Sequence, residues 1–185
     1  MGRVALEALL FRSLWRGDRL GWGLAWCFHA ALLVVLVRHL WLVVDGAPAW
    51  LAGVHFLGHG PAAMFAICAL GLLARRVGSA RHRYISIPSD YLWLALFIFM
   101  AASGVGLGRW SGVDLTAVRE WVQDLVGFSP GALPTNAVLV LHILGACVLL
   151  ALFPFSKLFH APAVFITPTW LARGRAGRSS ERGVR

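Results

Sequence analysis

The chain alternates long apolar blocks with short, arginine-rich polar segments, and four of the blocks are long enough to cross a bilayer. They run over Leu20–Val44, Leu51–Leu73, Tyr91–Gly108 and Ala137–Phe159. A helix needs about 20 apolar residues to span the hydrocarbon core. Because backbone polar groups in lipid must be bonded within their own segment, each block is expected to be helical. The pattern predicts an all-α membrane protein built as a four-helix transmembrane bundle.

Shorter segments surround these blocks. Residues 1–19 alternate arginine with an apolar stripe, which fits an interfacial amphipathic helix or a frayed basic flank of the first span. In the loop before the fourth block, Asp114 can cap a helix whose apolar positions recur at helical spacing, and we expect this helix to lie flat on the membrane surface. Residues 171–185 have little to bury and are expected to be a flexible tail. The four-span domain is thus predicted to cover residues 20–170.

The charge distribution gives topology rather than a nucleic-acid surface. The 185-residue chain is 59% hydrophobic, has a mean hydropathy of +0.73 and carries a formal charge of +9. Its positive charges sit in clusters between the apolar blocks. All but three of the 17 Lys and Arg residues fall on one side of the predicted membrane, the exceptions being Arg38, Arg109 and Arg119. The positive-inside rule therefore predicts that both termini are cytoplasmic.

Two pairs of histidines accompany the first and fourth apolar blocks, and the last of them, His160, directly follows the fourth block. His29 and His39 are ten residues apart, and His142 and His160 are eighteen apart. Eighteen residues are five turns, so the second pair would share one face of a continuous helix. Antiparallel spans place His29 at the depth of His160, and His39 at the depth of His142. A pair of neutral imidazoles can hold one low-spin haem b, so the pattern predicts two bis-histidine haems. No C-x-x-C-H motif for covalent haem attachment is present.

The two histidine pairs are not matched in their spacing along the helices. Along a helix the first pair is about 15 Å apart and the second about 27 Å, and the two rings of the first pair differ by about 80° in direction. A break at Pro154 is expected to absorb part of this mismatch. Arg38, beside His39, is either a cation for a haem propionate or an arginine that reaches the lipid headgroups. Lys157 has the same two interpretations near the other end.

His55 and His59 fall at i and i+4 in the second block, so in a continuous helix they share a face. One interpretation is a quinol site, since imidazole accepts protons near physiological pH and Asp45 in the adjoining turn could relay them. The alternatives are an additional haem or metal ligand and a structural pair bonded to nearby carbonyls. His82 lies in a basic loop and is expected to be solvated.

The histidine spacings resemble those of the gamma subunit of respiratory nitrate reductase. They equally resemble the cytochrome b subunits of sulfite-reductase-associated and heterodisulfide-reductase-like membrane complexes. The stretch FPFSKLFHAPAVFITPT at residues 153–169 is most similar to the latter two, and residues 75–107 resemble the family's loop and following span. Gamma subunits usually have a fifth span before the first histidine pair, where this chain has its basic amphipathic stretch.

The resemblance implies that His29 and His160 ligate an inner haem b and that His39 and His142 ligate an outer one. It implies an electron-transfer subunit in a prokaryotic cytoplasmic (inner) membrane, which exchanges electrons between the quinone pool and a cytoplasmic iron–sulfur subunit whose partner reduces the substrate. Two other classes stay open: a small transporter that uses histidines as a proton relay, and a haem-free membrane anchor.

Overall fold

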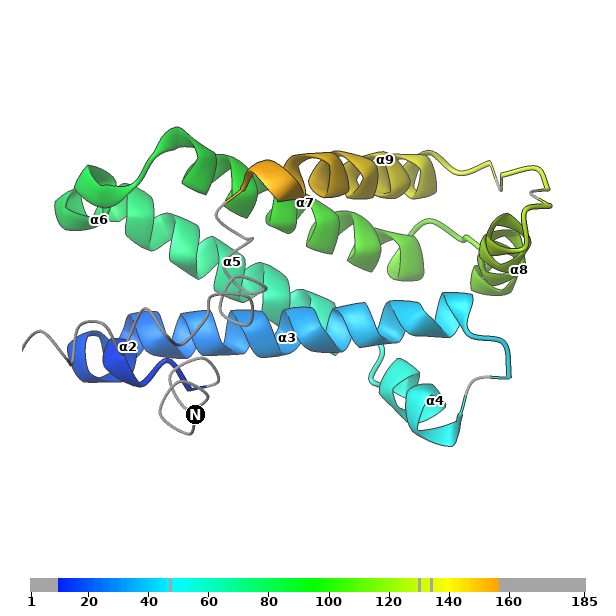
Figure 1. The fold of residues 1–185 in the computed structure, drawn as a ribbon, viewed down its shortest axis with the longest axis horizontal. Helices are drawn as coiled ribbons and strands as arrows, with labels where there is room; N and C mark the ends of the chain where they lie inside the picture. The colour runs from blue at the N-terminus through cyan, green and yellow to red at the C-terminus, as the bar shows by residue number, and fades with distance from the viewer. Residues whose placement is uncertain (1–9, 47, 130, 134, 157–185) are drawn as a thin grey trace, which may run out of the picture. The chain divides into compact units, whose positions relative to one another are not determined.

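The computed structural model describes residues 10–46, 48–129, 131–133 and 135–156, and every regular element within them is helical (Figure 1). The long helices are α3 (Arg19–Val43), α5 (Gly60–Gly78), α7 (Pro88–Arg109) and α9 (Ala137–Leu152), the last continuing into the 3₁₀ helix η1 (Phe153–Phe155). The short helices are α2 (Arg12–Gly17), α4 (Ala49–Phe56), α6 (Ala80–Ile85) and α8 (Leu115–Val126).

Four of the described helices are long and apolar enough to cross a membrane: α3, α5, α7, and α9 together with η1. The predicted all-α membrane fold with four spans is therefore confirmed. The contacts divide the chain into two compact units, residues 1–147 and 148–185. The packing described below lies within the first unit. In the second unit, the structure describes the end of α9, η1 and Ser156.

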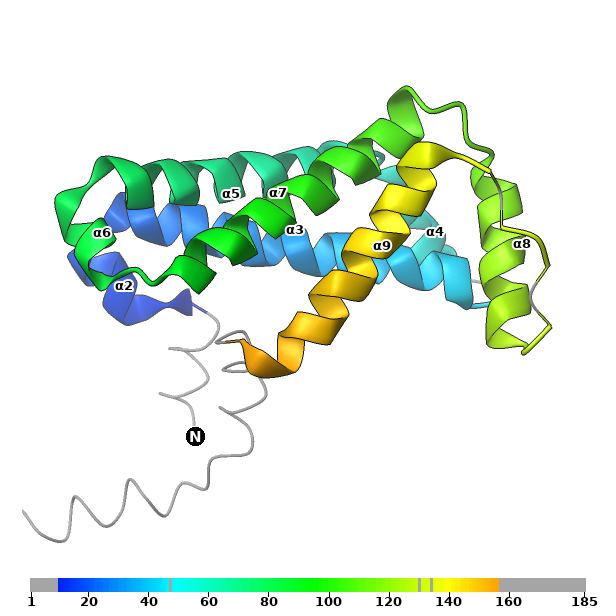
Figure 2. The same cartoon turned by 90° about the horizontal axis from the view of Figure 1, so that it is seen from above.

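Three aromatic rings form the core of the first unit. Helix α5 lies between α3 and α7 (Figures 1 and 2). The ring centroid of Phe28 on α3 is 4.8 Å from that of Phe65 on α5 and 5.5 Å from that of Phe97 on α7, and the last two are 5.6 Å apart. All three side chains are buried. Since lipid tails are as apolar as these rings, close packing rather than water exclusion holds the helices together.

Charged residues join the helix ends at the side of the bundle that carries α2 and α6. Asp18 caps α3 by accepting a hydrogen bond from the Gly21 N–H at 2.9 Å, and it also pairs with Arg75 at the end of α5. The next arginine, Arg76, lies 3.3 Å from Asp90 in the first turn of α7. Two consecutive arginines of α5 thus each contact the beginning of a neighbouring span.

Helix α8 lies across the opposite end of α3 (Figures 1 and 2). Asp114 caps it, as predicted, by accepting from the Thr116 N–H at 2.8 Å. The Arg119 guanidinium donates to the Val44 carbonyl at 3.0 Å and lies 4.6 Å from the centre of the Trp41 ring. The amphipathic segment therefore covers the end of α3 that lies beyond His39.

The prediction of one continuous second span over Leu51–Leu73 is wrong. Helix α4 ends at Phe56, a turn follows, and α5 begins at Gly60 and continues to Gly78. Gly58 adopts a φ of +62°, which glycine tolerates best, and Pro61 occupies the first turn of α5, where its missing N–H is not needed. The turn residues therefore end one helix and begin another.

The prediction of a continuous helix from His142 to His160 is also wrong. Helix α9 ends at Leu152, and the 3₁₀ turn that follows contains Pro154. Ser156 then adopts an extended backbone with φ −103° and ψ 158°. Proline cannot donate the helical hydrogen bond and it crowds the preceding turn, so the break expected at Pro154 is present. Residues 1–9 of the predicted interfacial segment, Lys157, His160 and the 171–185 tail lie outside the described residues.

Candidate histidine site

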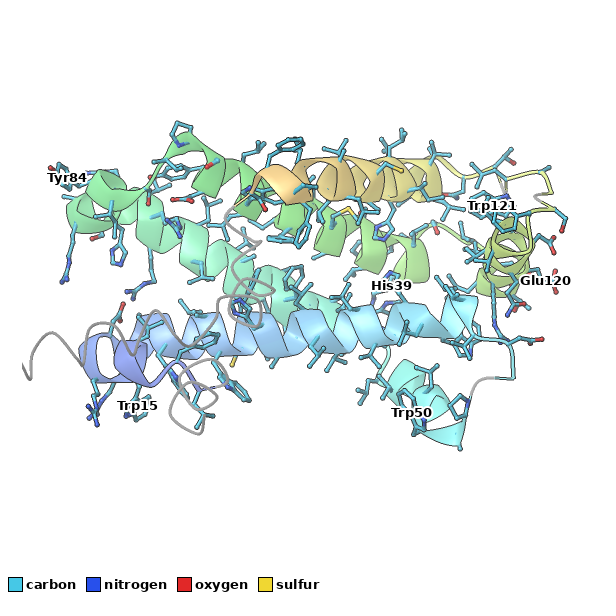
Figure 3. The ribbon with its side chains drawn as sticks, in the orientation of Figure 1. Trp15, His39, Trp50, Tyr84, Glu120 and Trp121 are labelled. Carbon is cyan, nitrogen blue, oxygen red and sulfur yellow. The ribbon has the colours of Figure 1, made fainter. Side chains whose placement is uncertain are left out.

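Two imidazoles from α3 and α9 lie close together in the first unit, with nearly parallel ring planes. The ring centroids of His39 and His142 are 6.2 Å apart, and the ring planes differ by 7°. Figure 3 shows His39 on the side of α3 that faces α7. The structure therefore brings together the two histidines that antiparallel depth had paired, although they are separated by about a hundred residues of sequence.

Hydrogen bonds define which nitrogen of each ring is available. The Nδ1 atom of His39 is 2.7 Å from the Val35 carbonyl, one turn back on α3. The Nδ1 atom of His142 is 2.8 Å from the Ser103 hydroxyl, and that hydroxyl is 3.1 Å from the Met100 carbonyl. A carbonyl can only accept, so Ser103 donates to Met100 and accepts from the His142 Nδ1–H. Both rings then carry their proton on Nδ1, which leaves the Nε2 lone pair free.

This arrangement fits an iron held between two imidazoles. Metal-binding histidines usually donate their second nitrogen to a carbonyl or another acceptor, which fixes the ring and raises the basicity of the ligating nitrogen. Two bonds of about 2 Å to a shared metal, plus the radius of each five-membered ring, place the centroids about 6 Å apart. The observed 6.2 Å meets that requirement. Among the residues that the structure describes, no group of three or more His, Cys, Asp and Glu side chains could hold a bare metal ion.

Two histidine rings pack against glycines of α7. A Cβ at Gly104 would lie 3.3 Å from the Cε1 atom of His142, and a Cβ at Gly108 would overlap the His59 ring. Gly104 and Gly108 are one helical turn apart, so His142 and His59 occupy successive positions along one face of α7. Sequence reasoning missed Ser103, Gly104 and Gly108 as site residues. The run GVGLG at residues 104–108 was the available signal, since a repeat of small residues lets other groups approach the helix closely.

His29 shows the same hydrogen bonding as His39. Its Nδ1 atom is 2.7 Å from the Ala25 carbonyl, again one turn back on α3. Its ring centroid is 5.2 Å from that of Phe28, a member of the core, and 5.2 Å from that of Phe11. The side chain is exposed within the described structure. Its predicted partner, His160, lies outside the described residues, so the inner pair stays a prediction.

The residues of the predicted quinol site lie on separate elements. The i, i+4 relation of His55 and His59 on one helical face is wrong, because the turn at residues 57–59 places His55 on α4 and His59 at the N-cap of α5. Asp45 lies exposed in the turn after α3, where its carboxylate accepts from the Gly46 N–H at 2.9 Å. Of the three, His59 is the residue whose contact with α7 relates it to His142.

Arg38 is half-buried beside His39, and its Nε atom is buried without a hydrogen-bond partner. An unsatisfied buried donor is costly and usually marks a ligand, an ion or a water. Both predicted roles, the propionate cation and the headgroup contact, would satisfy it.

Comparison with known proteins places the chain in a family. Residues 12–176 match the family model for the nitrate reductase gamma subunit. The chain is 33% identical to the Hdr-like menaquinol oxidoreductase cytochrome b-like subunit of Archaeoglobus fulgidus, in a match covering 91% of this chain and 59% of the relative. It is 32% identical to the nitrate reductase gamma chain of Bacillus subtilis, with 78% and 74% covered. It is 30% identical to the respiratory nitrate reductase 1 gamma chain of Escherichia coli, with 85% and 80% covered.

No solved structure is a significant match. The chain spans about three fifths of the length of the Archaeoglobus fulgidus relative. The family model covers most of the chain, including all four spanning helices and every histidine singled out above. By this match, which agrees with the resemblance of the histidine spacings, this integral membrane protein belongs to the nitrate reductase gamma subunit family.

Proposed function

We propose that this chain is the haem b-binding, quinone-reactive membrane subunit of an oxidoreductase complex. The observation that carries the proposal is the His39–His142 pair, whose rings are parallel and 6.2 Å apart. Their Nδ1 atoms are engaged by Val35 and Ser103, so two Nε2 lone pairs are available. The relatives, which are named as a cytochrome b-like subunit of a menaquinol oxidoreductase and as nitrate reductase gamma chains, support the same function.

The chain's residues hold and orient the cofactor. His39 and His142 would ligate one haem b, and His29 with His160 a second. A bound haem b supplies a one-electron carrier within the membrane, with a potential set by its ligands and their hydrogen bonds. Ser103 keeps His142 in the tautomer that can ligate, and Gly104 lets that ring lie close to α7. Both residues contact His142 and neither would ligate the iron, so both would act by positioning.

The charge distribution supports an orientation in which both termini are cytoplasmic, in a prokaryotic inner membrane. His29 and His160 then lie on the cytoplasmic side and His39 and His142 on the outer side. Electrons would pass between an outer quinone site and a cytoplasmic iron–sulfur subunit, which exchanges them with the substrate-reducing subunit of the complex.

His59 is the residue we assign to the quinone oxygen. It lies at the start of α5, and its ring rests on Gly108, one turn of α7 from the glycine beneath His142. A neutral imidazole can accept a proton from a quinol hydroxyl. Asp45, exposed in the turn after α3, is proposed to pass that proton to water, with His55 as a further member of the site.

The test is a reduced-minus-oxidised spectrum of the purified chain, with haem quantified per polypeptide. Two b-type haems are expected. His39→Ala and His142→Ala should each remove the same one, whereas His29→Ala and His160→Ala should remove the other. His82→Ala, in the basic segment α6, is the matched control and should keep both. A folded but colourless protein would contradict the proposal and favour the anchor or the transporter.

A second measurement addresses the quinone site. Addition of a short-chain quinol to the oxidised protein should reduce its haems, and His59→Ala should slow that reduction without changing the haem content. Equal rates in His59→Ala and the parent chain would remove His59 from the quinone site and leave the haem assignment unaffected.

A further inference from the structure

Unsatisfied hydrogen-bond donors gather where α8 crosses α3. In the part of the chain that the structure describes, four buried side-chain polar atoms have no hydrogen-bond partner. Three of them belong to this end of the first unit: Arg38 Nε on α3, and Arg119 Nε and Gln123 Nε2 on α8. The fourth, His82 Nδ1, lies on α6 at the other end of α5. We refer to Arg38, Arg119 and Gln123 as the α8 donor cluster.

Helical geometry places the members of the cluster on their two helices. Arg119 and Gln123 are at i and i+4, so they share one face of α8. Arg119 lies over Trp41 and donates to the Val44 carbonyl, which fixes its guanidinium against the end of α3. Arg38 precedes Trp41 by three residues and therefore lies one turn below it, about 60° round the helix. Arg38 thus lies in the last two turns of α3, and Arg119 contacts the same turns from α8.

The same geometry places the cluster next to His39. Arg38 is the residue before His39 on α3, so the two positions differ by about 100° round the helix and by only about 1.5 Å along its axis. It stands between the face that carries His39 and the face that carries Trp41. A group bound between His39 and His142 that extends toward α8 would meet Arg38 first and the α8 side chains about one turn further on.

The bonds seen in the structure do not account for all these donors. Arg119 uses its terminal nitrogen for the Val44 carbonyl and its flat face for Trp41, and these contacts explain why α8 is held against α3. They leave its Nε unsatisfied. A neutral carbonyl would satisfy one donor. Two guanidinium groups and an amide with unsatisfied nitrogens at one end of α3 are the kind of donors that bind an anion, above all a carboxylate or phosphate that can accept several hydrogen bonds.

We infer that the α8 donor cluster binds a carboxylate of the group held between His39 and His142, so that α8 is a cofactor-binding element rather than only a surface cover. The inference rests on the proposed function, in which that group is a haem whose propionates are its only anionic substituents. Arg38 and Arg119 would donate to the propionate, and the Gln123 amide would turn its nitrogen toward it. A phospholipid phosphate offers the same chemistry, and the experiment separates the two sources.

The experiment is a redox titration of the purified haem-loaded chain, followed optically, on the component that His39→Ala removes. At an effective dielectric of about 20, a positive charge within about 10 Å of a redox centre would favour its reduced state by about tenfold, and its removal would reverse that effect. We therefore expect Arg119→Gln and Arg38→Gln each to lower that midpoint potential by about 59 mV, the one-electron equivalent of tenfold. Arg109→Gln removes an exposed charge at the C-terminal end of α7 and is the control. It should lower the midpoint potential by less than a third as much.

A second readout identifies the anion. In reduced-minus-oxidised infrared spectra of protein carrying haem labelled with ¹³C at the propionate carboxyls, the labelled carboxylate band should shift in Arg119→Gln and Gln123→Leu relative to the parent chain. Arg119→Lys keeps the charge but lacks the planar fork, so it should preserve most of the potential and still shift the band. Full haem content in each variant establishes that the chain has folded.

The outcomes are distinct. A chain without a haem that His39→Ala removes would contradict the proposed function and this inference together. A haem that depends on His39 but is indifferent to Arg38→Gln and Arg119→Gln would overturn the inference alone. A fall in potential with an unmoved propionate band, accompanied by loss of copurified phospholipid phosphate, would also overturn it and assign the cluster to a lipid headgroup.

Discussion

Ser103 offers the sharpest test of the proposed histidine site, because it is neither a proposed ligand of the iron nor a proposed contact of the quinone and would act through its hydrogen bond to His142. Its hydroxyl donates to the Met100 carbonyl and accepts the Nδ1–H of His142 at 2.8 Å. Ser103→Ala removes the acceptor while leaving the helix unchanged, since alanine is the best helix former. The His142 Nδ1–H is then left without a partner in a half-buried position.

Two effects should follow from this loss. An unsatisfied buried donor costs about 1–3 kcal/mol. Removal of the hydrogen bond behind a metal-bound histidine typically lowers metal affinity by about 10–100-fold, which corresponds to about 1.4–2.7 kcal/mol. The affinity for the outer haem should therefore fall by about that factor. The potential of that haem should rise, because an imidazole that no longer donates its Nδ1–H is a weaker electron donor and stabilises oxidised iron less.

The assay is haem loss to an acceptor protein, together with a redox titration of each component. Ser103→Thr retains the hydroxyl and should behave like the parent chain. Ser111→Ala is a matched control, because Ser111, just beyond the end of α7, likewise donates to a carbonyl of that helix, that of Leu107 at 2.6 Å. The reasoning is refuted if Ser103→Ala retains the outer haem as tightly and at the same potential as the parent, or if Ser111→Ala has the same effect.

Three further substitutions address the packing and pairing of the helices in the first unit. Gly108→Val should displace the His59 ring, lower the free energy of unfolding by about 1–3 kcal/mol through overpacking, and slow quinol-driven reduction. The control is Gly23→Val, where an added side chain meets open space, and both variants are compared by thermal unfolding followed by circular dichroism. Phe97→Ala removes three ring pairs worth about 0.5–1.5 kcal/mol each, so detergent unfolding should show a loss of about 2–4 kcal/mol, and a loss below 0.5 kcal/mol would contradict the role given to the core. Asp18→Asn breaks a partly exposed ion pair with Arg75 but keeps an oxygen that can cap α3, so it should cost no more than about 1 kcal/mol in thermal unfolding and its effect should shrink in high salt. A larger cost that persists in high salt would contradict this reading of the pair.

The spanning helices were predictable because their cause is local. Each needs a run of apolar residues long enough for the bilayer, and that run is visible in the sequence. The ends of the spans were harder to predict from the sequence. The turn at residues 57–59 sits inside an apolar run, so hydropathy carried the second span straight through it, although Gly58 and Pro61 mark the break. The expected break at Pro154 was correct. The argument that His142 and His160 share a face required a continuous helix between them, whereas α9 ends at Leu152.

The proximity of His39 and His142 was accessible from sequence for a similar reason. In a bilayer, antiparallel spans fix the depth of every residue, so two histidines in the same half of adjacent spans are brought near one another. The depth of a residue in the bilayer does not specify the direction of its side chain round the helix, its hydrogen-bond partners or the residues that its ring packs against. Ser103, Gly104 and Gly108 belong to a third helix, and nothing in their local sequence states which histidine each one meets.

By itself the sequence determined that this protein has four membrane helices, that its polar residues within them are mainly histidines, and that two of those histidines lie at one depth. These properties follow from composition and helical period, which act over one or two turns. Only the tertiary structure decided that the two rings are nearly parallel with centroids 6.2 Å apart, that their free nitrogens are the Nε2 atoms, and that α8 brings Arg119 to the end of α3. Those features depend on how helices rotate and pack against one another, and that arrangement is settled by the fit of side chains from several distant segments at once.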